Sequence, residues 1–407
     1  MTDIIKASGP TIRHLADVPA SFRLTGLLLL RAKRGALSFE LPDGRIVEFD
    51  HGEPGPRAHI QVHDYQFARR SLAGGDIGFA ESYMAGQWST DDLTGVLEFF
   101  SENFEAAGKL AVGNFAMRSL NLLRHLFNRN SKAGSKRNIM AHYDIGNDFY
   151  EAWLDETMTY SSALFDKPNM SLEQGQAAKY SAIADDIGAG PDSRILEIGC
   201  GWGGFAEHVA RTRGSHVTCL TISEAQREYA LERIQKQGLQ DRVDIRLEDY
   251  RDHVGKYDGV ASIEMFEAVG ESYWPSYFAK VRESLNDGCK AALQIITIQD
   301  DLFLEYRKRT DFIQRYIFPG GMLPGETVLK QAFDNSGLTY QGVRYFGADY
   351  AETLKRWSHR FEEAWHDIIP MGFDEHFRRM WKFYLSYCEA GFRNGRINVG
   401  QFRLAKA

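Results

Sequence analysis

The chain lacks several features that would place it in particular protein classes. It has four cysteines in 407 residues, without Cys-x-x-Cys spacing, which argues for reduced thiols in a cytoplasmic protein. It has no charged-then-apolar signal segment at its start, and the apolar run at residues 27–30 is far shorter than the ~20 residues needed to span a bilayer. The net charge of −7 argues against a general nucleic-acid binder. The cysteines are Cys200, Cys219, Cys289 and Cys388.

The length and composition predict two domains. With 407 residues, 43% hydrophobic and 25% charged, the chain is a soluble globular protein too long for one ordinary core. For residues 1–108 we expect a small α+β domain, because short apolar runs alternate with turns and Asp43-Gly44 indicates a hairpin. We expect β-like runs at 22–30, 36–41, 45–49 and 60–62, and helical segments at 67–73, 79–84 and 93–104.

A stretch without acidic residues follows this domain. Residues 106–143 contain no Asp or Glu, and apolar side chains interleave with seven bases at roughly helical spacing. We assign 109–137 as a basic amphipathic segment and linker. It is either an interdomain helix with solvated bases or an interfacial helix drawn to anionic lipid, where each base near the surface contributes ~1 kcal/mol. The bases are Lys109, Arg118, Arg124, Arg129, Lys132, Lys136 and Arg137.

Strands and helices alternate through residues 138–407, which predicts a parallel, doubly wound sheet with its ligand at the carboxyl ends of the strands. The mostly helical stretch 299–390 is rich in aromatic residues, which either fill a core or line a long apolar pocket. Strand candidates are 194–199, 216–222, 243–248, 257–263 and 291–298, with late strands at one edge from 338–345 and 398–405; helix candidates include 205–211 and 224–237.

One stretch carries the strongest chemical signal, Arg194-Ile-Leu-Glu-Ile-Gly-Cys-Gly-Trp-Gly-Gly204. It predicts a strand, a glycine turn and a helix, which together present bare backbone and a helix N-terminus to a nucleotide-like ligand. A Gly-x-Gly alone is a weak indication, because such turns often serve only packing. Here the carboxylate of Glu197 lies just inside the strand. A carboxylate beside the turn suits a cationic, phosphate-free ligand, so we favour S-adenosylmethionine over NAD.

Five longer motifs occur in order: His142-Tyr-Asp-x-x-Asn-Asp-Phe-Tyr150, Met158-Thr-Tyr-Ser161, Leu196-Glu-Ile-Gly-Cys-Gly-Trp-Gly-Gly204, Phe312-Ile-x-x-Tyr-Ile-Phe-Pro-Gly-Gly321 and Phe346-Gly-Ala-Asp-Tyr350. Together they resemble the cyclopropane-fatty-acyl-phospholipid synthases, and residues 78–88 look like the N-terminal domain of the bacterial members. The resemblance implies an α/β fold, with a Rossmann-like class I methyltransferase sheet and helical lipid-pocket insertions in 138–407.

The same resemblance implies the reaction partners. S-adenosylmethionine would be the methyl donor, and the double bond of an unsaturated phospholipid acyl chain at the membrane surface would be the acceptor. We therefore expect a cytoplasmic protein bound peripherally to the inner face of the membrane. We expect neither nucleic acid nor metal as a partner, and a homodimer is a further hypothesis.

Family positions also imply the residues that line the cofactor. Gly199 and Gly201 would let the ligand approach the backbone, Thr221 and Gln226 would bond its polar groups, and Tyr250 would cover the adenine. Besides Glu197, the implied set is Tyr160, Ser161, Gly199, Gly201, Thr221, Ile222, Gln226, Asp249 and Tyr250.

The catalytic positions depart from the family pattern. Cyclopropane-forming members hold a bicarbonate ion as the base, using a cysteine, a glutamate, a histidine, an isoleucine backbone and a tyrosine. In this chain Ser162 stands at the cysteine position and Gln294 at the histidine position, and Glu264 replaces a usual glycine. The three positions that are kept are Glu267, Ile296 and Tyr350, and Ala268 replaces a further histidine.

These changes favour a different product. A second carboxylate near Glu267 disfavours a bound anion, and a protein carboxylate can itself act as the base. Members with a glutamate at this glycine position include ones that make methyl-branched chains. We therefore expect an S-adenosylmethionine-dependent C-methyltransferase whose product is a methyl-branched unsaturated chain. The alternative is a cyclopropane synthase in which Glu264 points away and bicarbonate stays bound; a catalytically dead binding protein and a small-molecule methyltransferase are weaker hypotheses.

Overall fold

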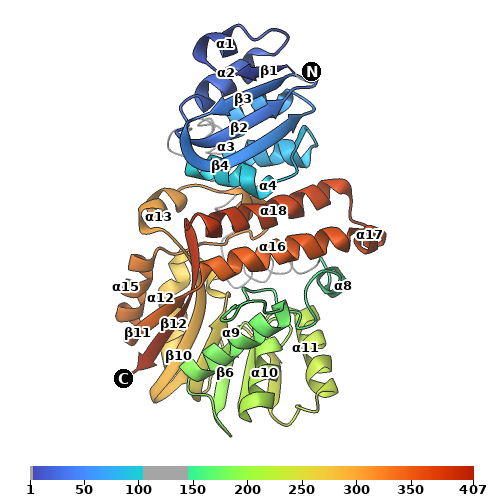
Figure 1. The fold of residues 1–407 in the computed structure, drawn as a ribbon. Helices are drawn as coiled ribbons and strands as arrows, with labels where there is room; N and C mark the ends of the chain where they lie inside the picture. The colour runs from blue at the N-terminus through green and yellow to red at the C-terminus, as the bar shows by residue number, and fades with distance from the viewer. Residues whose placement is uncertain (1–2, 104–144) are drawn as a thin grey trace. The chain divides into compact units, whose positions relative to one another are not determined.

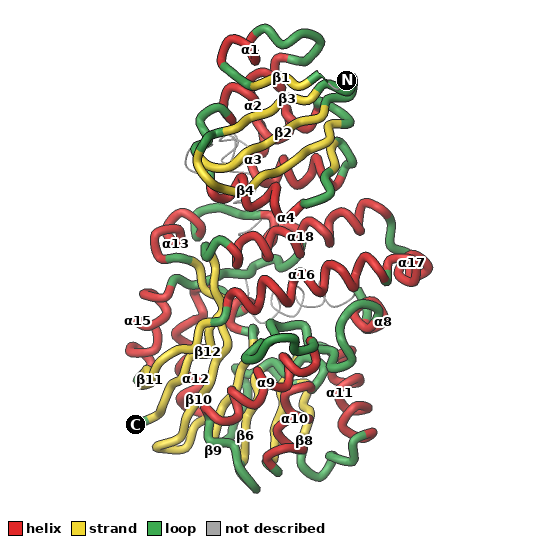
Figure 2. Tube along the Cα trace, in the orientation of Figure 1, coloured by secondary structure: helices red, strands yellow, loops and turns green. Residues whose placement is uncertain are grey.

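The computed structural model describes residues 3–103 and 145–407, which form two compact units (Figures 1 and 2). The first unit comprises residues 3–103 with Lys308–Ile317 and Ile369–Asn394, and the second comprises residues 145–307 with Phe318–Ile368 and Gly395–Ala407. The sequence-based division placed all of 138–407 in one domain, whereas two of its segments fold with the N-terminal residues. The basic segment 109–137 and the start of the 142–150 motif lie outside the described residues.

The first unit is built on a five-stranded sheet in the order β1-β3-β2-β4-β5. Strands β2 and β3 form the hairpin predicted from Asp43-Gly44, with Leu41 N donating to Arg45 O at 2.8 Å across the turn. The strands are β1 (Ile4–Lys6), β2 (Arg34–Glu40), β3 (Ile46–Asp50), β4 (Glu53–Val62) and β5 (Trp88–Ser89). The helices are α1 (Gly9–Arg13), α2 (Ala20–Leu29), α3 (Gln66–Met84), α4 (Leu93–Glu102), α14 (Phe312–Tyr316), η3 (Ile369–Met371) and α18 (Glu375–Arg393).

Helix α2 overturns the β-like prediction for residues 22–30. Phe22, Gly26 and Leu29 are buried at helical spacing, so the run has one apolar face and is not a strand. The two predicted helical segments 67–73 and 79–84 belong to the single element α3, which is interrupted at Gly75 because its φ of 64° is not helical.

The second unit contains a seven-stranded sheet in the order β11-β12-β10-β9-β6-β7-β8. The five strands from β10 to β8 are parallel, as predicted, and β12 pairs antiparallel with both β10 and β11. The two late strands therefore extend one edge. Their bounds are β6 (Arg194–Ile198), β7 (His216–Thr221), β8 (Val243–Leu247), β9 (Tyr257–Ile263), β10 (Leu285–Ile298), β11 (Leu338–Tyr345) and β12 (Ile397–Lys406).

Helices cover both faces of this sheet (Figure 1), and the side chains on each face form a separate core. Ile195 of β6 packs with Phe205 beneath α9, α10 and α11, whereas its neighbour Leu196 packs with Phe278 and Phe333 beneath α12 and α15. Burying such a side chain stabilises the fold by about 1.5–3 kcal/mol. The helices are α8 (Asn147–Glu151), α9 (Leu172–Asp186), α10 (Gly204–Arg213), α11 (Glu224–Lys236), η1 (Phe266–Ala268), η2 (Glu271–Tyr273), α12 (Trp274–Ser284), α13 (Asp300–Tyr306), α15 (Glu326–Ser336), α16 (Gly347–Glu363) and α17 (Trp365–Ile368).

This topology places the candidate residues together. Because β6, β7, β8, β9 and β10 are parallel, their carboxyl ends meet at one edge of the sheet. Gly199 and Gly201, Ile222 and Gln226, Asp249 and Tyr250, and Glu264 and Glu267 follow the ends of β6, β7, β8 and β9 in turn. Within the described ranges, every helix is too short or too polar to span a bilayer.

Candidate active site

The glycine turn follows β6 and leads into α10. Gly199 has a φ of 82° and Gly201 a φ of 51°, both in the left-handed region that favours glycine. The backbone amides of Gly199 and Cys200 donate to Leu220 O, which fixes the turn against β7. A Cβ on Gly199 would lie 2.6 Å from Met265 Cγ, whereas a Cβ on Gly201 would meet no described atom within 4 Å. Gly199 is therefore required by packing, and Gly201 leaves the open space that a cofactor bound at the turn would need.

Glu197 supports this turn from within the sheet. Its side chain is buried, the thiol of Cys219 donates to Oε2 at 3.6 Å, and the backbone of Ala206 in the first turn of α10 also bonds the carboxylate. Burial raises the pKa of Glu197 to about 8, so the group is mostly protonated at neutral pH. The partners of Glu197 are Cys219 on β7 and the backbone of Ala206 in α10, so the carboxyl group links the strands to the helix that follows the glycine turn. These contacts fit a role in shaping the turn.

The other predicted cofactor residues follow the ends of β7 and β8. Thr221 Oγ1 bonds Gln226 Oε1 at 3.2 Å, and Ile222 beside them is partly exposed. Tyr250 contacts the ring of Tyr277 edge-on, with 5.5 Å between the ring centroids. Arg251 binds both carboxylate oxygens of Asp249, at 2.8 and 2.5 Å, and so fixes the position of this side chain.

Tyr160 is the second aromatic member of the predicted set, besides Tyr250. It is partly exposed and lies between two rings, those of Tyr150 and Trp357, each with its centroid 5.3 Å away. Asn147 joins the same region to the glycine turn, because Trp202 Nε1 donates to its side-chain oxygen at 2.8 Å.

Glu264 lies at the centre of the predicted catalytic set. It comes directly after β9 and has a φ of 51°, so the chain bends at this residue. Its Oε1 accepts hydrogen bonds from Ser161 Oγ at 2.7 Å, Ser162 N at 3.0 Å and Gln294 Nε2 at 2.7 Å. Its Oε2 accepts from the Tyr350 hydroxyl at 2.5 Å. The structure thus brings four of the predicted residues onto one carboxylate.

The donors around Glu264 are themselves held in place. The hydroxyl of Ser162 donates to Ala163 O at 2.9 Å, so this residue serves Glu264 through its backbone amide. The Gln294 amide is oriented by Gln401, whose Nε2 donates to Gln294 Oε1 at 3.2 Å. Gln176 on α9 donates to the carbonyl of Ser161 at 2.8 Å. The carboxylate therefore meets a preorganised set of donors.

Glu267 lies three residues later, in η1, and its environment is different. Its Oε1 accepts from the backbone amide of Ile296 at 2.6 Å, whereas its Oε2 is shielded from solvent and has no hydrogen-bond partner among the described residues. Burial, and secondarily the charge of Glu264, raise the pKa of Glu267 to about 8. Glu267 is therefore mostly protonated at neutral pH.

Helix α16 anchors the loop that supplies Ser161 and Ser162. The Thr353 hydroxyl accepts from Ala163 N at 3.1 Å, and Asp349 Oδ2 accepts from Phe165 N at 3.0 Å. Arg360 donates to two backbone carbonyls at the start of the loop, each at 2.8 Å. Because Tyr350 is on the same helix, α16 fixes both the loop and the Glu264 carboxylate.

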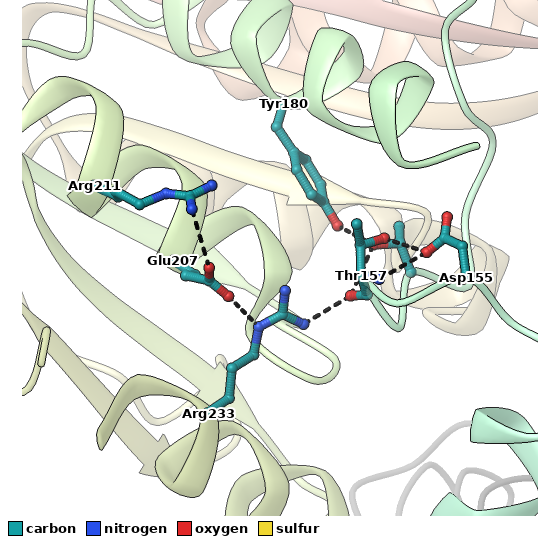
Figure 3. Close-up of polar contacts among 7 residues, drawn as sticks. Asp155, Thr157, Tyr180, Glu207, Arg211 and Arg233 are labelled. Atoms are coloured by element: carbon teal, nitrogen blue, oxygen red, sulfur yellow. Dashed lines mark hydrogen bonds and ion pairs between the residues drawn. The ribbon is translucent and has the colours of Figure 1, made fainter. Parts of the chain in front are cut away.

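A second set of contacts holds the loop from the side of α10 and α11 (Figure 3). Arg233 pairs with Glu207 and donates to Thr157 O at 2.7 Å, and Thr157 Oγ1 donates to Asp155 Oδ1 at 2.5 Å. Three of these residues also line an open polar cleft of about 790 Å³. Glu264, Glu267, Gly199 and Gly201 are not among its lining residues, so we assign it no part in the candidate site.

Sequence reasoning missed the residues that position this site. Asp349 lies inside a quoted motif, but Thr353 and Gln401 act over long sequence separations that no local pattern reveals. Gln176 and Lys179 did leave a signal, because they are polar residues at helical spacing on the buried face of α9.

Comparison with known proteins places the chain among lipid-modifying enzymes. The family model described as mycolic acid cyclopropane synthetase matches residues 130–402. The chain is 40% identical over 354 residues to tuberculostearic acid methyltransferase UfaA1 of Mycobacterium tuberculosis, covering 83% of this chain and 81% of that protein. It is 36% identical over 346 residues to the cyclopropane-fatty-acyl-phospholipid synthase of Escherichia coli, covering 84% and 87%.

Solved structures of cyclopropane synthases have folds similar to that of this chain. The cyclopropane synthase MmaA2 from Mycobacterium tuberculosis has a TM-score of 0.63 at 28% identity, over 67% of this chain and 98% of that one. The mycolic acid cyclopropane synthase CmaA1, solved with SAH and CTAB, gives the same values.

Proposed function

The chain belongs to the mycolic acid cyclopropane synthetase family, and from that premise we propose that it methylates a double bond of unsaturated phospholipid acyl chains and releases a methyl-branched, still unsaturated chain. Family membership confirms the resemblance found in the motifs. The protein is an S-adenosylmethionine-dependent methyltransferase that acts on lipid acyl chains. The phospholipid acceptor and the branched product are the proposed parts.

The observation that carries the proposal is the setting of Glu264. Its carboxylate accepts hydrogen bonds from Ser162, Gln294 and Tyr350, which stand at the cysteine, histidine and tyrosine positions of the family's bicarbonate site. A carboxylate of the chain thus takes up the donors that a bicarbonate ion would need. This arrangement supports Glu264 as the built-in base.

The cofactor and the chain have separate tasks in this scheme. S-adenosylmethionine supplies an electrophilic methyl group, and its addition to an alkene leaves a carbocation that must lose a proton. Glu264 accepts that proton, and its fixed position selects the carbon that loses it. A double bond re-forms when the proton comes from a chain carbon beside the cation. A ring forms when the proton comes from the new methyl group, whose carbon then bonds the cationic carbon.

Electrostatics argue against a bound bicarbonate beside Glu264. A second anion would meet the Glu264 charge at short range, and like charges at such separations disfavour binding. Glu267, whose pKa is about 8, adds little charge at pH 7. Because Glu267 is mostly protonated at neutral pH, Glu264 is the member of the pair that this proposal assigns as the base.

The backbone of Glu264 gives independent support. A residue with a side chain costs about 1–2 kcal/mol in the left-handed region, and glycine avoids that cost. The φ of 51° explains why the family usually has glycine here. The chain tolerates a glutamate at a strained position, and the four hydrogen bonds to its carboxylate offset the strain. Such strain is characteristic of functional sites.

We also propose that the enzyme binds peripherally at the inner face of the membrane. The acceptor chains lie in a bilayer, and the basic segment 109–137 supplies charges that anionic lipid attracts. That segment lies outside the described residues, so this proposal rests on its sequence. The homodimer remains a prediction.

Cyclopropane synthesis is the second candidate, favoured by the retained Glu267 and Tyr350 and by the similarity to the Escherichia coli synthase.

One experiment distinguishes the two products. The enzyme is incubated with methyl-labelled S-adenosylmethionine and vesicles of dioleoyl phosphatidylglycerol, and the released acyl chains are analysed by mass spectrometry before and after catalytic hydrogenation. Both products gain CH2, but only the branched product still contains a double bond that takes up hydrogen as an ordinary alkene. A ring as the sole product would overturn the proposal.

A further inference from the structure

One arginine joins three segments of the chain that lead to the candidate site. Arg233 on α11 pairs through Nε with Glu207 on α10, and its Nη1 donates to the carbonyl of Thr157 at 2.7 Å. Figure 3 shows the Arg233 side chain between these two partners. The ion pair is mostly shielded from solvent, because the side chains of Arg233 and Glu207 are 16% and 9% exposed. Hydrogen bonds of a guanidinium group to such acceptors are strong and directional.

Each of the three segments carries or follows predicted cofactor residues. Helix α10 begins directly after the glycine turn, and α11 follows β7 with Gln226 in its first turn. Thr157 lies in the loop shortly before Tyr160 and Ser161. Arg233 therefore ties together three parts of the chain that are expected to surround one ligand.

The turn at residues 155–159 contains a strained residue and is braced on two sides. Met158 is buried and has a φ of 48°, in the left-handed region that residues other than glycine rarely adopt. Such a conformation persists only where the surrounding contacts fix it. Thr157 Oγ1 donates to Thr159 Oγ1 at 2.8 Å, and Thr159 Oγ1 shares a 2.8 Å hydrogen bond with the hydroxyl of Tyr180 on α9. The turn is thus held between α9 and α11.

The start of α10 packs closely against the same contacts. A Cβ on Gly204, the first residue of α10, would lie 2.7 Å from the Tyr180 hydroxyl and 3.4 Å from Thr159 Oγ1. The turn and the helix that follows the glycine turn therefore meet without spare room. A shift of the turn would move Tyr160 and Ser161 relative to the glycine turn.

We propose that Arg233 is a positioning residue for the cofactor, which holds Glu207 and the Thr157 carbonyl together and thereby fixes Tyr160 and Ser161 at the S-adenosylmethionine site. The proposal rests on the proposed placement of these two residues at the cofactor, and it is independent of which group acts as the base. A site that is fixed before the ligand arrives loses less conformational freedom on binding. The affinity for S-adenosylmethionine should therefore depend on Arg233.

Arg233→Lys separates this role from a contribution to stability alone. Lysine keeps the positive charge that pairs with Glu207, but it replaces two diverging donors of a planar group with a single nitrogen. The substitution therefore removes the geometry that joins Glu207 to the Thr157 carbonyl.

Arg242→Lys is the matched control. Arg242 likewise pairs with a carboxylate, that of Asp192, and donates to a backbone carbonyl, that of Gly214. It lies directly before β8, at the edge of the sheet opposite the candidate site. The two variants thus lose the same kind of bridge at opposite ends of the strands.

Calorimetric titration with S-adenosylmethionine gives the dissociation constants of wild type and both variants, and melting temperatures are measured in parallel. Steady-state assays give KM for S-adenosylmethionine and for dioleoyl phosphatidylglycerol vesicles. We expect Arg233→Lys to raise the dissociation constant and KM for S-adenosylmethionine by roughly 10- to 100-fold, because a misplacement of ~1 Å can cost about 100-fold. KM for the vesicles should stay unchanged, and Arg242→Lys should bind the cofactor like wild type.

Wild-type cofactor affinity in Arg233→Lys, or an equal loss of affinity in Arg242→Lys, would overturn the proposal. If Arg233→Lys does not fold, Thr159→Val decides by the same criterion, because it removes the hydrogen bond between the turn and Tyr180. The wild-type product is identified in the same samples. A ring as the sole product would remove the role of Glu264 and leave the comparison of affinities standing, so the two proposals fail separately.

Discussion

The Tyr350 hydroxyl donates a 2.5 Å hydrogen bond to Oε2 of Glu264, whose Oε1 already accepts three hydrogen bonds. The two oxygens therefore differ, because Oε2 has a single donor among the described residues and keeps lone-pair capacity for a proton. In this account Oε2 is the basic atom, and Tyr350 holds it in position from α16.

Tyr350→Phe removes this one donor and keeps the ring. A hydrogen bond to a charged group contributes about 1.5–3 kcal/mol, so we expect kcat to fall roughly 10- to 100-fold. Steady-state kinetics with labelled cofactor measure the change, and Tyr340→Phe on β11 is the matched control. Equal rates for wild type and Tyr350→Phe would show that Oε2 does not depend on this hydrogen bond.

Glu264→Gln keeps the shape of the side chain and removes its basicity. We expect methyl transfer to fall by roughly 10²- to 10⁴-fold, the range typical of a lost general base. The exposed Glu363→Gln on α16 is the control for a lost carboxylate. Single-turnover assays separate the chemical step from product release, and activity of Glu264→Gln within a few-fold of wild type would exclude it as the base.

Gly201→Ala places a Cβ in the open space over the glycine turn. We expect calorimetric titration to show roughly tenfold or weaker binding of S-adenosylmethionine by a folded protein, because the methyl group strains the backbone and blocks ligand approach. Gly288→Ala is the matched control, since Gly288 also has a positive φ and open space around its Cβ position. If both variants bind like wild type, Gly201 does not contact the cofactor.

The pH dependence of stability tests the environment of Glu267. Its folded pKa is raised from 4.5 to about 8, so its protonated form contributes stability that is complete below about 4.5 and is lost as the pH rises through about 8. The melting temperature of wild type relative to Glu267→Gln should therefore fall across this window, with Glu363→Gln as the control. A constant difference would mean that Glu267 is not buried in its protonated form.

Vesicle binding of a variant of the basic segment 109–137 tests membrane recruitment. Replacing Arg124, Arg129, Lys136 and Arg137 with Gln should weaken binding to anionic vesicles, and salt should weaken wild-type binding, because screened attraction supplies part of the free energy. The control variant replaces four exposed bases elsewhere in the chain with Gln, so both variants have the same net charge. These bases are Arg57, Lys236, Arg246 and Lys330. Equal loss in both variants would leave the segment with no specific role.

The sequence predicted the local structure around the candidate residues where short-range patterns determine it. The strand, turn and helix around Gly199 and Gly201 follow from apolar periodicity and glycine spacing, and the strained backbone at Glu264 agrees with the glycine that the family usually has there. The run at 22–30 was misassigned because its apolar content concealed a helical spacing. Thr353 and Gln401 were missed because they act across separations of 190 and 107 residues.

The product made without bicarbonate tests the central claim most directly. Wild type and the triple variant Glu264→Gly, Ser162→Cys, Gln294→His are assayed in buffer freed of carbon dioxide, with and without added bicarbonate, and the acyl products are identified by mass spectrometry. We predict that wild type makes the same amount of a methyl-branched, unsaturated chain in both buffers, while the triple variant shifts toward a cyclopropane only when bicarbonate is present. A wild type that requires bicarbonate and makes only cyclopropane would contradict Glu264 as the built-in base.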